Sequence, residues 1–429
     1  MRRAVTGLLR VLLRLFFRRI EVVGLENVPA DMPVVFAANH PNGLVDPLFI
    51  LCFAPRPVSF LAKAPLFRYP LIGYFVRVLD AIPVYRKQDN TKGTNAETFA
   101  RAREVLRSGG SIAIFPEGTT HSDSQLRELK TGAARIALGA QLPSIAIVPA
   151  GIYYTAKQTF RSEALVWFGA PLIVAAVPVG EDGEPPPAAA IDLTAKIEKQ
   201  LDSVTLQADS RAALELIARA EDIFSGGAEQ PLATELELRR RFVDGFHYLR
   251  ERDPARLAQL SSAVRQFSSE LGGARLDPED LTPRIDARAM LRVIILLPVA
   301  VIGAVLHFLP YKVVDFLSRR FSRDADEMTA TVKFIASLLL YPIWWIAVTI
   351  VVWRMAGRTI GASMIIVLPL AGHVALRVIE QVDEFTGKLR AMVYRTRSRA
   401  AHARLVAHRQ RIREQILAVA DALDQSLAS

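Results

Sequence analysis

A histidine and an aspartate stand six positions apart in the segment NHPNGLVDP, which spans residues 39–47. A histidine takes up a proton near neutral pH and returns it, so His40 suits the activation of an alcohol as a general base. It needs a partner on its other ring nitrogen, and Asp46 is the only acid within reach in the sequence. Six residues would place the two on different faces of a helix, whereas a turn over Pro41–Gly43 folds Asp46 back toward His40. The alternative is structural: His40 fills a core or caps a helix, and Asp46 caps a helix before Pro47.

A second group of polar residues lies in the segment FPEGTTHSDSQLRELKTG, which spans residues 115–132. FPEG is expected to end a strand, and Gly118 opens a tight turn whose backbone N–H groups could face an anion. Lys130 could reach the same charge. In the alternative interpretation, Glu117 is a solvated turn acid and Lys130 is an exposed helix cation.

A third candidate is an arginine suited to phosphate. Arg86 ends the segment AIPVYR (81–86), and its planar guanidinium offers a fork of donors that matches a phosphate. Its alternative role is a surface ion pair. Cys52 is the only cysteine and lies in an apolar stretch, so we expect no intramolecular disulfide and no metal–thiolate site. Together the three groups suggest transfer of a group from a thioester to a hydroxyl on a phosphate-bearing acceptor.

The residues around these motifs predict an α/β domain that positions them. Short apolar runs predict strands, and two segments have helical spacing. Their alternation indicates a mixed sheet flanked by helices. The proline- and glycine-rich segment GEDGEPPPAAA (180–190) is expected to mark a domain boundary. The predicted strands are residues 34–39, 58–62, 111–115, 145–151 and 164–169, the predicted helices are residues 96–106 and 126–138, and residues 191–288 are expected to form polar amphipathic helices with breaks at Gly226–Gly227 and Gly272–Gly273.

Composition and apolar runs indicate a membrane protein. The formal net charge of +10 suits an anionic membrane surface or nucleic acid, but the arginines of the C-terminal tail are not interleaved with stacking aromatic residues. Three uncharged apolar runs, residues 293–309, 334–353 and 360–376, favour the membrane, although each could be a buried soluble helix. The positive-inside rule places the basic tail in the cytoplasm. Two full spans and an interfacial third run would keep the tail and the N-terminal domain on one side, whereas three full spans would separate them.

The N-terminus is expected to form an amphipathic helix in the membrane interface. Placed at 100° per residue, Arg3, Arg10, Arg14 and Arg18 fall on one stripe, and large apolar residues cover the opposite arc. The arginines would then point toward lipid phosphates. The alternative is a helix packed on its own domain.

The order of these motifs resembles the glycerophospholipid acyltransferase superfamily, whose four blocks correspond here to NHPNGLVD, AIPVYR, FPEGTTH and IVPAG. The resemblance covers roughly residues 20–180. Five residues separate His40 from Asp46, where the family commonly has four, and the extra residue falls in the Pro-Asn-Gly turn. This spacing, His121 after FPEG, and the segment LKTGAARIA resemble the branch that acylates glycerol-3-phosphate or dihydroxyacetone phosphate in fungi.

The resemblance implies a reaction and a set of site residues. His40 would deprotonate the acceptor hydroxyl, which attacks the thioester directly, and Asp46 would hold His40 and compensate its charge. Arg86, Lys130 and the turn at Gly118 would bind the acceptor phosphate, and Glu117 would position the acceptor or Arg86. The resemblance implies no cofactor and no metal, with acyl-CoA or acyl-ACP as co-substrate. Two alternatives stay open: 1-acylglycerol-3-phosphate as the acceptor, and a non-catalytic membrane scaffold that binds lipid.

The expected organisation has five parts. They are an interfacial helix (1–20), an acyltransferase domain (21–205), a helical connector (206–288), membrane-embedded helices (289–378) and a basic helical tail (379–429). The expected partners are the acyl thioester donor, the phosphorylated glycerol acceptor and membrane lipids, without nucleic acid. We expect an integral membrane protein with the acyltransferase domain on the cytoplasmic face of a bacterial inner membrane.

Overall fold

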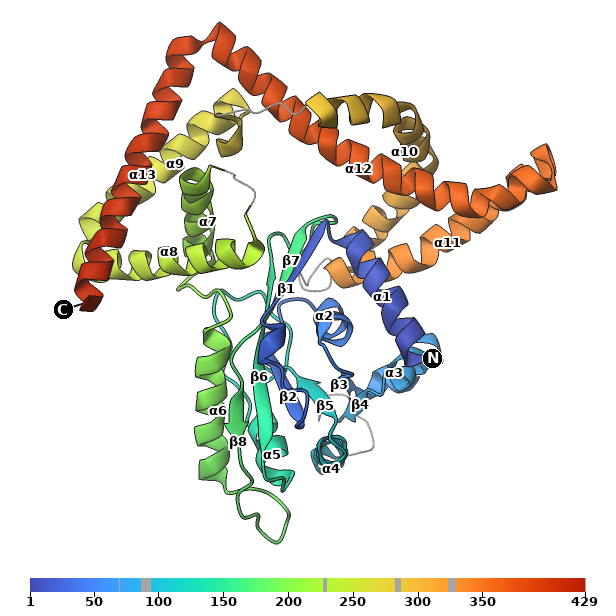
Figure 1. The fold of residues 1–429 in the computed structure, drawn as a ribbon, viewed down its shortest axis with the longest axis vertical. Coiled ribbons are helices and arrows are strands. Elements are labelled where there is room, and N and C mark those ends of the chain that lie inside the picture. Colours follow the sequence, from blue (N-terminus) through green and yellow to red (C-terminus); the bar gives the residue numbers. More distant parts are fainter. Residues whose placement is uncertain (69, 86–93, 227–229, 282–286, 323–328, 429) are drawn as a thin grey trace. The chain divides into compact units, whose positions relative to one another are not determined.

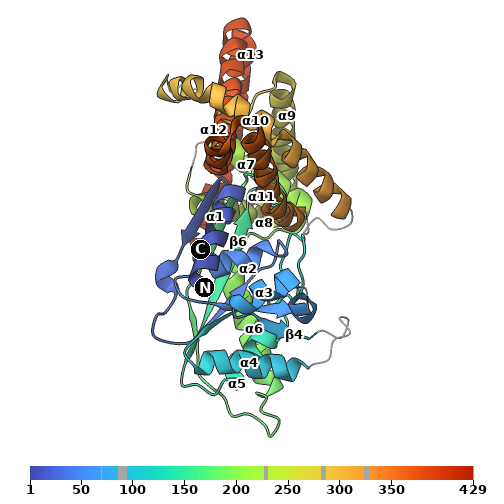
Figure 2. The same cartoon turned by 90° about the vertical axis from the view of Figure 1, so that its right-hand side faces the viewer.

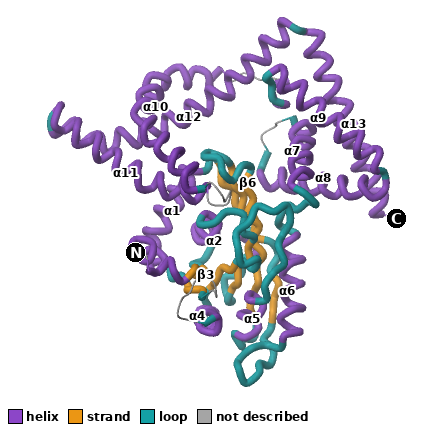
Figure 3. Tube along the Cα trace, turned by 180° about the vertical axis from the view of Figure 1, so that it is seen from behind, coloured by secondary structure: helices purple, strands orange, loops and turns teal. Residues whose placement is uncertain are grey.

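The computed structural model describes residues 1–68, 70–85, 94–226, 230–281, 287–322 and 329–428. The chain divides into two compact units (Figure 1). The first comprises Met1–Gln207 with Ser322–Val332, and the second comprises Ala208–Phe321 with Lys333–Ser429. The described strands all lie in the first unit, and the described elements of the second unit are helical (Figure 3).

The first unit is built on a mixed sheet. Its described strands follow the order β1-β7-β6-β2-β5-β3-β4, and β8 also pairs with β6. Strands β6, β2, β5, β3 and β4 are parallel to one another, whereas β7 and β8 run antiparallel to β6. The strands are β1 Arg19–Val23, β2 Val34–Ala38, β3 Ser59–Lys63, β4 Ile82–Val84, β5 Ser111–Ile114, β6 Ile145–Tyr154, β7 Glu163–Phe168 and β8 Leu172–Val174.

Helices cover both faces of this sheet (Figure 2). On one face, Val35, Ile112 and Ile147 pack in a single core with α4, α5 and α6. Alternate side chains such as Phe36 point to the other face, on the side where α2 contacts β3 and β7, and α1 contacts α2. The helices of this unit are α1 Arg2–Phe16, α2 Val45–Phe53, α3 Pro70–Val78, α4 Asn95–Arg107, α5 Gly132–Gly139 and α6 Pro187–Asp202.

The predicted fold class is confirmed, and all five predicted strands are present. Strands β1, β4 and β8 were not predicted. They are three to five residues long, and β1 and β4 form the two edges of the sheet. Strands β4 and β8 are too short to show a period, and β1 (RIEVV) includes two charged residues, so none of the three gives a clear strand pattern.

The predicted helix over residues 126–138 begins only at Gly132. A helix would direct the N–H of Lys130 to the carbonyl of residue 126, but this N–H donates to Pro116 O at 2.8 Å. The N–H of Arg127 likewise donates to Glu117 Oε2 at 3.0 Å. Residues 126–131 therefore form a loop held against the FPEG turn.

The predicted boundary at residues 180–190 is wrong. Helix α6 begins at Pro187, and its Leu193 and Ile197 belong to the same core as the sheet. Arg103 donates to Gly183 O at 3.0 Å and pairs with Glu184 at 3.1 Å, which ties the loop to α4. Proline and glycine thus mark a loop inside the unit, because the apolar face of α6 is needed to cover the sheet.

The N-terminal helix packs on its own unit through one apolar face and exposes another. Leu13 and Phe16 are buried, whereas Leu8 and Val11 are each 55% exposed. The single apolar arc inferred from the sequence is therefore divided between the protein interior and the surface. Residues from Arg19 onward form β1 rather than a continuation of this helix.

Not every arginine of the predicted stripe is available to lipid phosphates. Arg10 donates to Cys52 O at 2.9 Å, and Arg18 donates to Glu163 Oε1 at 3.0 Å. These two arginines bind the protein instead of pointing away from it. Because one apolar face of α1 is exposed, the location of this helix in the membrane interface stays a prediction.

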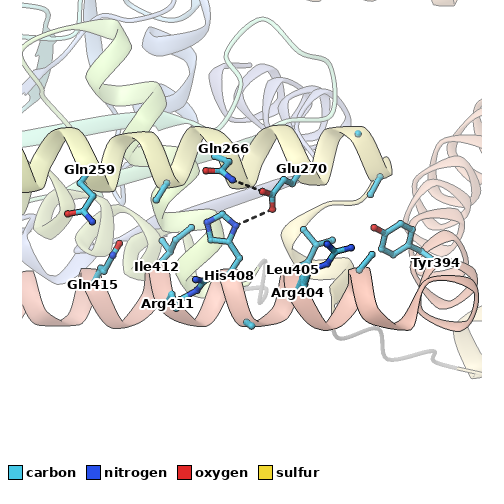
Figure 4. Close-up of a pocket in the computed structure, with 15 residues that line it drawn as sticks. Gln259, Gln266, Glu270, Tyr394, Arg404, Leu405, His408, Arg411, Ile412 and Gln415 are labelled. Atoms are coloured by element: carbon cyan, nitrogen blue, oxygen red, sulfur yellow. Dashed lines mark hydrogen bonds and ion pairs between the residues drawn. The ribbon is translucent and has the colours of Figure 1, made fainter.

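The second unit contains a helical bundle. Helices α7, α8, α9 and α13 contact one another, and Ile223, Phe267 and Ile412 share one core. A groove of about 760 Å³ lies between α9 and α13, where Glu270 and His408 are 3.1 Å apart (Figure 4). The helices are α7 Arg211–Ser225, α8 Leu232–Arg252, α9 Pro254–Ala274 and α13 Arg399–Ala428.

Two predicted breaks in this region have different outcomes. Gly226 ends α7 in the left-handed conformation, as expected for a helix C-terminus. Helix α9 instead continues through Gly272–Gly273 to Ala274. The basic tail is helical but not one helix, because α12 ends at Arg397 and α13 begins after Ser398.

Three described helices are long and apolar enough to cross a membrane: α10 (Ala287–Phe321), α11 (Thr329–Ala356) and α12 (Arg358–Arg397). Each is longer than the apolar run that predicted it. Helices α10 and α12 pack together, and a Cβ added at Gly303 would lie 2.3 Å from Ala371 O. Glycine therefore allows the two backbones to approach closely, as small residues do between membrane helices.

Helix α11 compensates for a proline in α10. Pro310 has no backbone N–H, so the carbonyl of Leu306 lacks its helical donor. The indole N–H of Trp344 donates to that carbonyl at 2.9 Å, and the indole of Trp345 donates to His307 Nε2 at 2.9 Å. Because lipid supplies no substitute donors, these contacts fix α11 against α10.

We expect the tail and the first unit to lie on the same side of the membrane. Cys52 is the only cysteine and is buried, so one introduced cysteine reports its own location. Glu104→Cys in α4 and Gln425→Cys in α13 place it at exposed positions. Both variants should react with a membrane-impermeant maleimide from the same side of sealed vesicles. Labelling from opposite sides would mean three full spans and would contradict this topology.

Candidate active site

The candidate residues gather where parallel strands end. His40 follows β2, Glu117 follows β5, and Lys63 is the last residue of β3. Because these strands are adjacent and parallel, their carboxyl ends meet at one edge of the sheet. Arg86 comes two residues after β4 but lies outside the described residues.

His40 and Asp46 form a hydrogen-bonded pair. Their Nδ1 and Oδ2 atoms are 2.9 Å apart. The turn after His40 leads into α2, whose first turn carries Asp46, so the predicted fold-back brings the two side chains together. With Nδ1–H donated to the carboxylate, Nε2 of His40 is left as a proton acceptor. The His40 ring stacks on Phe115 at 4.2 Å and is 16% exposed.

Asp46 is fully buried and receives two further hydrogen bonds. The backbone N–H of Asn42 donates to Oδ2 at 2.6 Å, and the hydroxyl of Tyr154 donates to Oδ1 at 2.6 Å. Burial raises the pKa of Asp46, although His40, Tyr154 and Asn42 each act to lower it. Since the folded-state pKa lies above the unfolded value, protonation of Asp46 favours the folded state, and the charged form is maintained only by its donors.

Tyr154 was not predicted as a site residue. It ends β6, and its ring stacks on Phe17 at 5.6 Å and contacts Phe49 edge-on at 5.7 Å. Burial, together with the charge of Asp46, raises the pKa of Tyr154 well above its usual value. The phenol therefore stays protonated and remains a hydrogen-bond donor to Asp46.

Glu117 holds the backbone of His40 and is itself enclosed. Its Oε1 accepts from the N–H of His40 at 2.9 Å, and its Oε2 accepts from the N–H of Arg127 at 3.0 Å. The side chain is fully buried. Both oxygens of the Glu117 carboxylate are thus engaged within the protein, and the expectation that Glu117 positions the acceptor or Arg86 stays a prediction.

His121 supports Glu117. The N–H of Asp123 donates to His121 Nδ1 at 3.2 Å, so Nε2 carries the proton and donates to Glu117 Oε2. The N–H of His121 also donates to His40 O at 3.3 Å. The sequence singled out His121 as part of the FPEG segment but did not assign it this role.

The turn at Gly118 differs from the predicted anion cradle. The Gly118 N–H donates to Phe115 O at 2.9 Å and is thus engaged inside the turn. Gly118 has φ +72°, and an added Cβ would lie 2.5 Å from Lys130 Nζ. The glycine therefore allows the exposed Lys130 to lie across the turn, and the positive charge at this position comes from the ammonium group rather than from the Gly118 amide.

Lys157, whose side chain contacts the turn after His40, was not predicted from the sequence. Lys157 Nζ donates to Pro41 O at 3.1 Å and to Ser122 Oγ at 2.6 Å. Lys157 lies between β6 and β7, where no motif pointed to it. Lys63 carried a signal in the sequence, because it directly follows the predicted strand over residues 58–62, which the structure pairs with the strand that leads to FPEG.

Metal-ligand clusters and reactive thiols are two other features that could carry chemistry. Within the described ranges, no three His, Cys, Asp or Glu side chains gather as a metal-ligand set. Burial raises the pKa of the Cys52 thiol to about 12, so this cysteine is a poor nucleophile.

Comparison with known proteins gives consistent matches. Residues 19–153 match the family model described as Acyltransferase. The chain is 27% identical over 298 residues to glycerol-3-phosphate O-acyltransferase 2 of Saccharomyces cerevisiae, an alignment that covers 62% of this chain and 39% of that relative. It is 26% identical to glycerol-3-phosphate O-acyltransferase 1 of the same yeast, with 62% and 47% covered.

Shorter alignments match proteins of another name. A chloroplastic 1-acyl-sn-glycerol-3-phosphate acyltransferase of Arabidopsis thaliana is 30% identical over 142 residues, which cover 33% of this chain and 38% of that relative. The chain therefore spans less than half the length of these curated relatives. The crystal structure of the 1-acyl-sn-glycerophosphate acyltransferase PlsC from Thermotoga maritima aligns with a TM-score of 0.36 at 22% identity, covering 47% of this chain and 79% of that chain.

Replacing Tyr154 by phenylalanine should raise the pKa of Asp46 further. The variant keeps the ring and its packing but removes the one donor to Asp46 Oδ1, and this donor lowers the pKa. Titration of the aspartate carboxyl carbons by NMR would measure the change. Tyr153→Phe is the matched control, because its side chain points to the opposite face of β6. An unchanged Asp46 titration in Tyr154→Phe would contradict the role given to this hydroxyl.

Proposed function

We propose that this protein transfers a fatty acyl group from an acyl thioester to glycerol-3-phosphate or dihydroxyacetone phosphate, because residues 19–153 match the family model described as Acyltransferase and two yeast relatives are named glycerol-3-phosphate O-acyltransferases. The observation that carries the proposal is the His40–Asp46 pair, which leaves Nε2 of His40 as a proton acceptor at the edge of the sheet where β2, β5 and β3 end.

The pair supports direct attack by an alcohol. Nε2 of His40 takes the proton of the acceptor hydroxyl while the acceptor oxygen bonds to the thioester carbonyl carbon. Asp46 stabilises the imidazolium that forms. When the C–S bond breaks, His40 returns its proton to the thiolate, which leaves as a thiol. The step needs no nucleophile from the protein, in agreement with the buried, weakly acidic Cys52.

Cations at the same edge suit a phosphate on the acceptor. Lys130 lies across Gly118, and within the described residues its ammonium has no carboxylate partner. Lys63 ends β3 and is exposed. Arg86 follows the neighbouring strand β4, so it remains a proposed third cation at this edge. Two or three cations at one edge of the sheet favour a small dianion over an uncharged alcohol.

The lengths of the alignments favour the small acceptor. The two yeast relatives named glycerol-3-phosphate O-acyltransferase align over 62% of this chain, and the plant relative named for 1-acyl-sn-glycerol-3-phosphate aligns over 33%. 1-Acylglycerol-3-phosphate is the second candidate acceptor. The donor is acyl-CoA or acyl-ACP, and the enzyme is proposed to work at the cytoplasmic face of a bacterial inner membrane, where its three apolar helices anchor it.

Parallel assays of one purified preparation test the proposal. Labelled acyl-CoA or acyl-ACP is offered with glycerol-3-phosphate, dihydroxyacetone phosphate and 1-acylglycerol-3-phosphate. Transfer to one of the first two should be fastest. His40→Ala should reduce it by roughly 10²–10⁴-fold, the usual value of general acid–base assistance. Substantial activity in a folded His40→Ala preparation would refute the mechanism, and faster transfer to the third acceptor would favour the second candidate.

Removing the charge at Lys130 should weaken acceptor binding. A charge-assisted hydrogen bond contributes about 1.5–3 kcal/mol, so Lys130→Ala should raise the acceptor KM roughly tenfold to a hundredfold and leave the donor KM unchanged. Lys196→Ala, an exposed lysine of α6, is the matched control. An equal effect on donor and acceptor would assign Lys130 to the donor site instead.

A further inference from the structure

The turn from His40 to Leu44 is held by several hydrogen bonds. Most come from elements already described: Glu117 accepts from the His40 N–H, Asp46 accepts from the Asn42 N–H, and Lys157 donates to Pro41 O. This turn sets the position of His40 relative to Asp46. Each contact to it therefore bears on the alignment of the pair.

A further contact comes from a distant part of the chain. The backbone N–H of Leu44 donates to the side-chain oxygen of Thr331 at 3.1 Å, across 287 positions in sequence. Thr331 is 6% exposed and its neighbour Ala330 is 1% exposed, so the first turn of α11 is packed into the structure at this point. Residues Ser322–Val332 accordingly belong to the same compact unit as the sheet.

The Leu44 N–H needs an acceptor from elsewhere. Helix α2 begins at Val45, and the first N–H groups of a helix have no partner within the helix. The N–H of an N-cap residue is normally satisfied by a glutamate or glutamine at the third helical position. Leu44 is the N-cap of α2, and the third helical position is Pro47, which has no side-chain acceptor. The hydroxyl of Thr331 supplies an acceptor at the start of the helix that carries Asp46.

We propose that Thr331 is a positioning residue for the His40–Asp46 pair, provided by the first turn of a helix long enough to cross a membrane. Helix α11 runs without interruption from Thr329 to Ala356. A helix that anchors the protein in lipid therefore also fixes the turn on which the general base depends. This inference rests on the proposed function only for its effect on rate, because the contact itself is independent of the substrate.

Two substitutions separate the hydroxyl from the packing of the residue. Thr331→Val keeps the shape and removes the acceptor, and Thr331→Ser keeps the acceptor and removes the methyl group. Thr331→Val should lower kcat by roughly two- to tenfold, the range for one neutral hydrogen bond, with both KM values unchanged. Thr331→Ser should retain most of the wild-type rate. Thr349→Val is the matched control, a buried threonine of the same helix whose hydroxyl has no hydrogen-bond partner among the described residues.

Hydrogen exchange of the full-length protein gives a readout that does not depend on activity. In Thr331→Val, a peptide covering residues 40–50 should exchange faster than in the wild type, while a peptide covering β6 should not change. Wild-type exchange and kcat in Thr331→Val would overturn the proposal, as would an equal loss in Thr331→Ser. If the wild type acylates none of the acceptors, the proposed function fails, and the exchange comparison still decides whether Thr331 holds the turn.

Discussion

A fully buried carboxylate, that of Asp46, is the constraint on which the rest of the site depends. A charged carboxyl group without water is costly unless donors surround it. Its donors come from His40 after β2, from the Asn42 backbone in the following turn, and from Tyr154 at the end of β6. Strand β2 pairs with β6, so the central part of the sheet must be in place before this charge can be held.

A second buried carboxylate, that of Glu117, also binds His40, but through the backbone of that residue. Glu117 accepts from the His40 backbone and from His121, and the N–H of His121 donates back to His40 O. The two histidine–acid pairs are thus joined through the peptide groups of His40. Hydrogen bonds to His40 therefore link the loop after β2 with the loop after β5. In the proposed mechanism, this link holds the general base in position for a bound hydroxyl.

Two helices that are proposed to meet lipid also contribute to the surroundings of this site. Helix α1 buries Phe16 next to the aromatic cluster around Tyr154 and exposes Leu8 and Val11. Helix α11 contributes Thr331 to the turn after His40. The acyl product of the proposed reaction is insoluble in water, so a site that includes residues from such helices suits the proposed function.

The sequence by itself determined the α/β class, the five main strands, the His40–Asp46 pair and the three long apolar helices, because periodicity and turn chemistry are local properties of the chain. Tertiary structure decided that Glu117 faces inward toward the backbone of His40, and that Tyr154 and Thr331 complete the turn. Each of these contacts pairs a buried polar group with a partner far away in sequence. No local pattern encodes such a pairing, since the partner is chosen by which elements the folded sheet brings together.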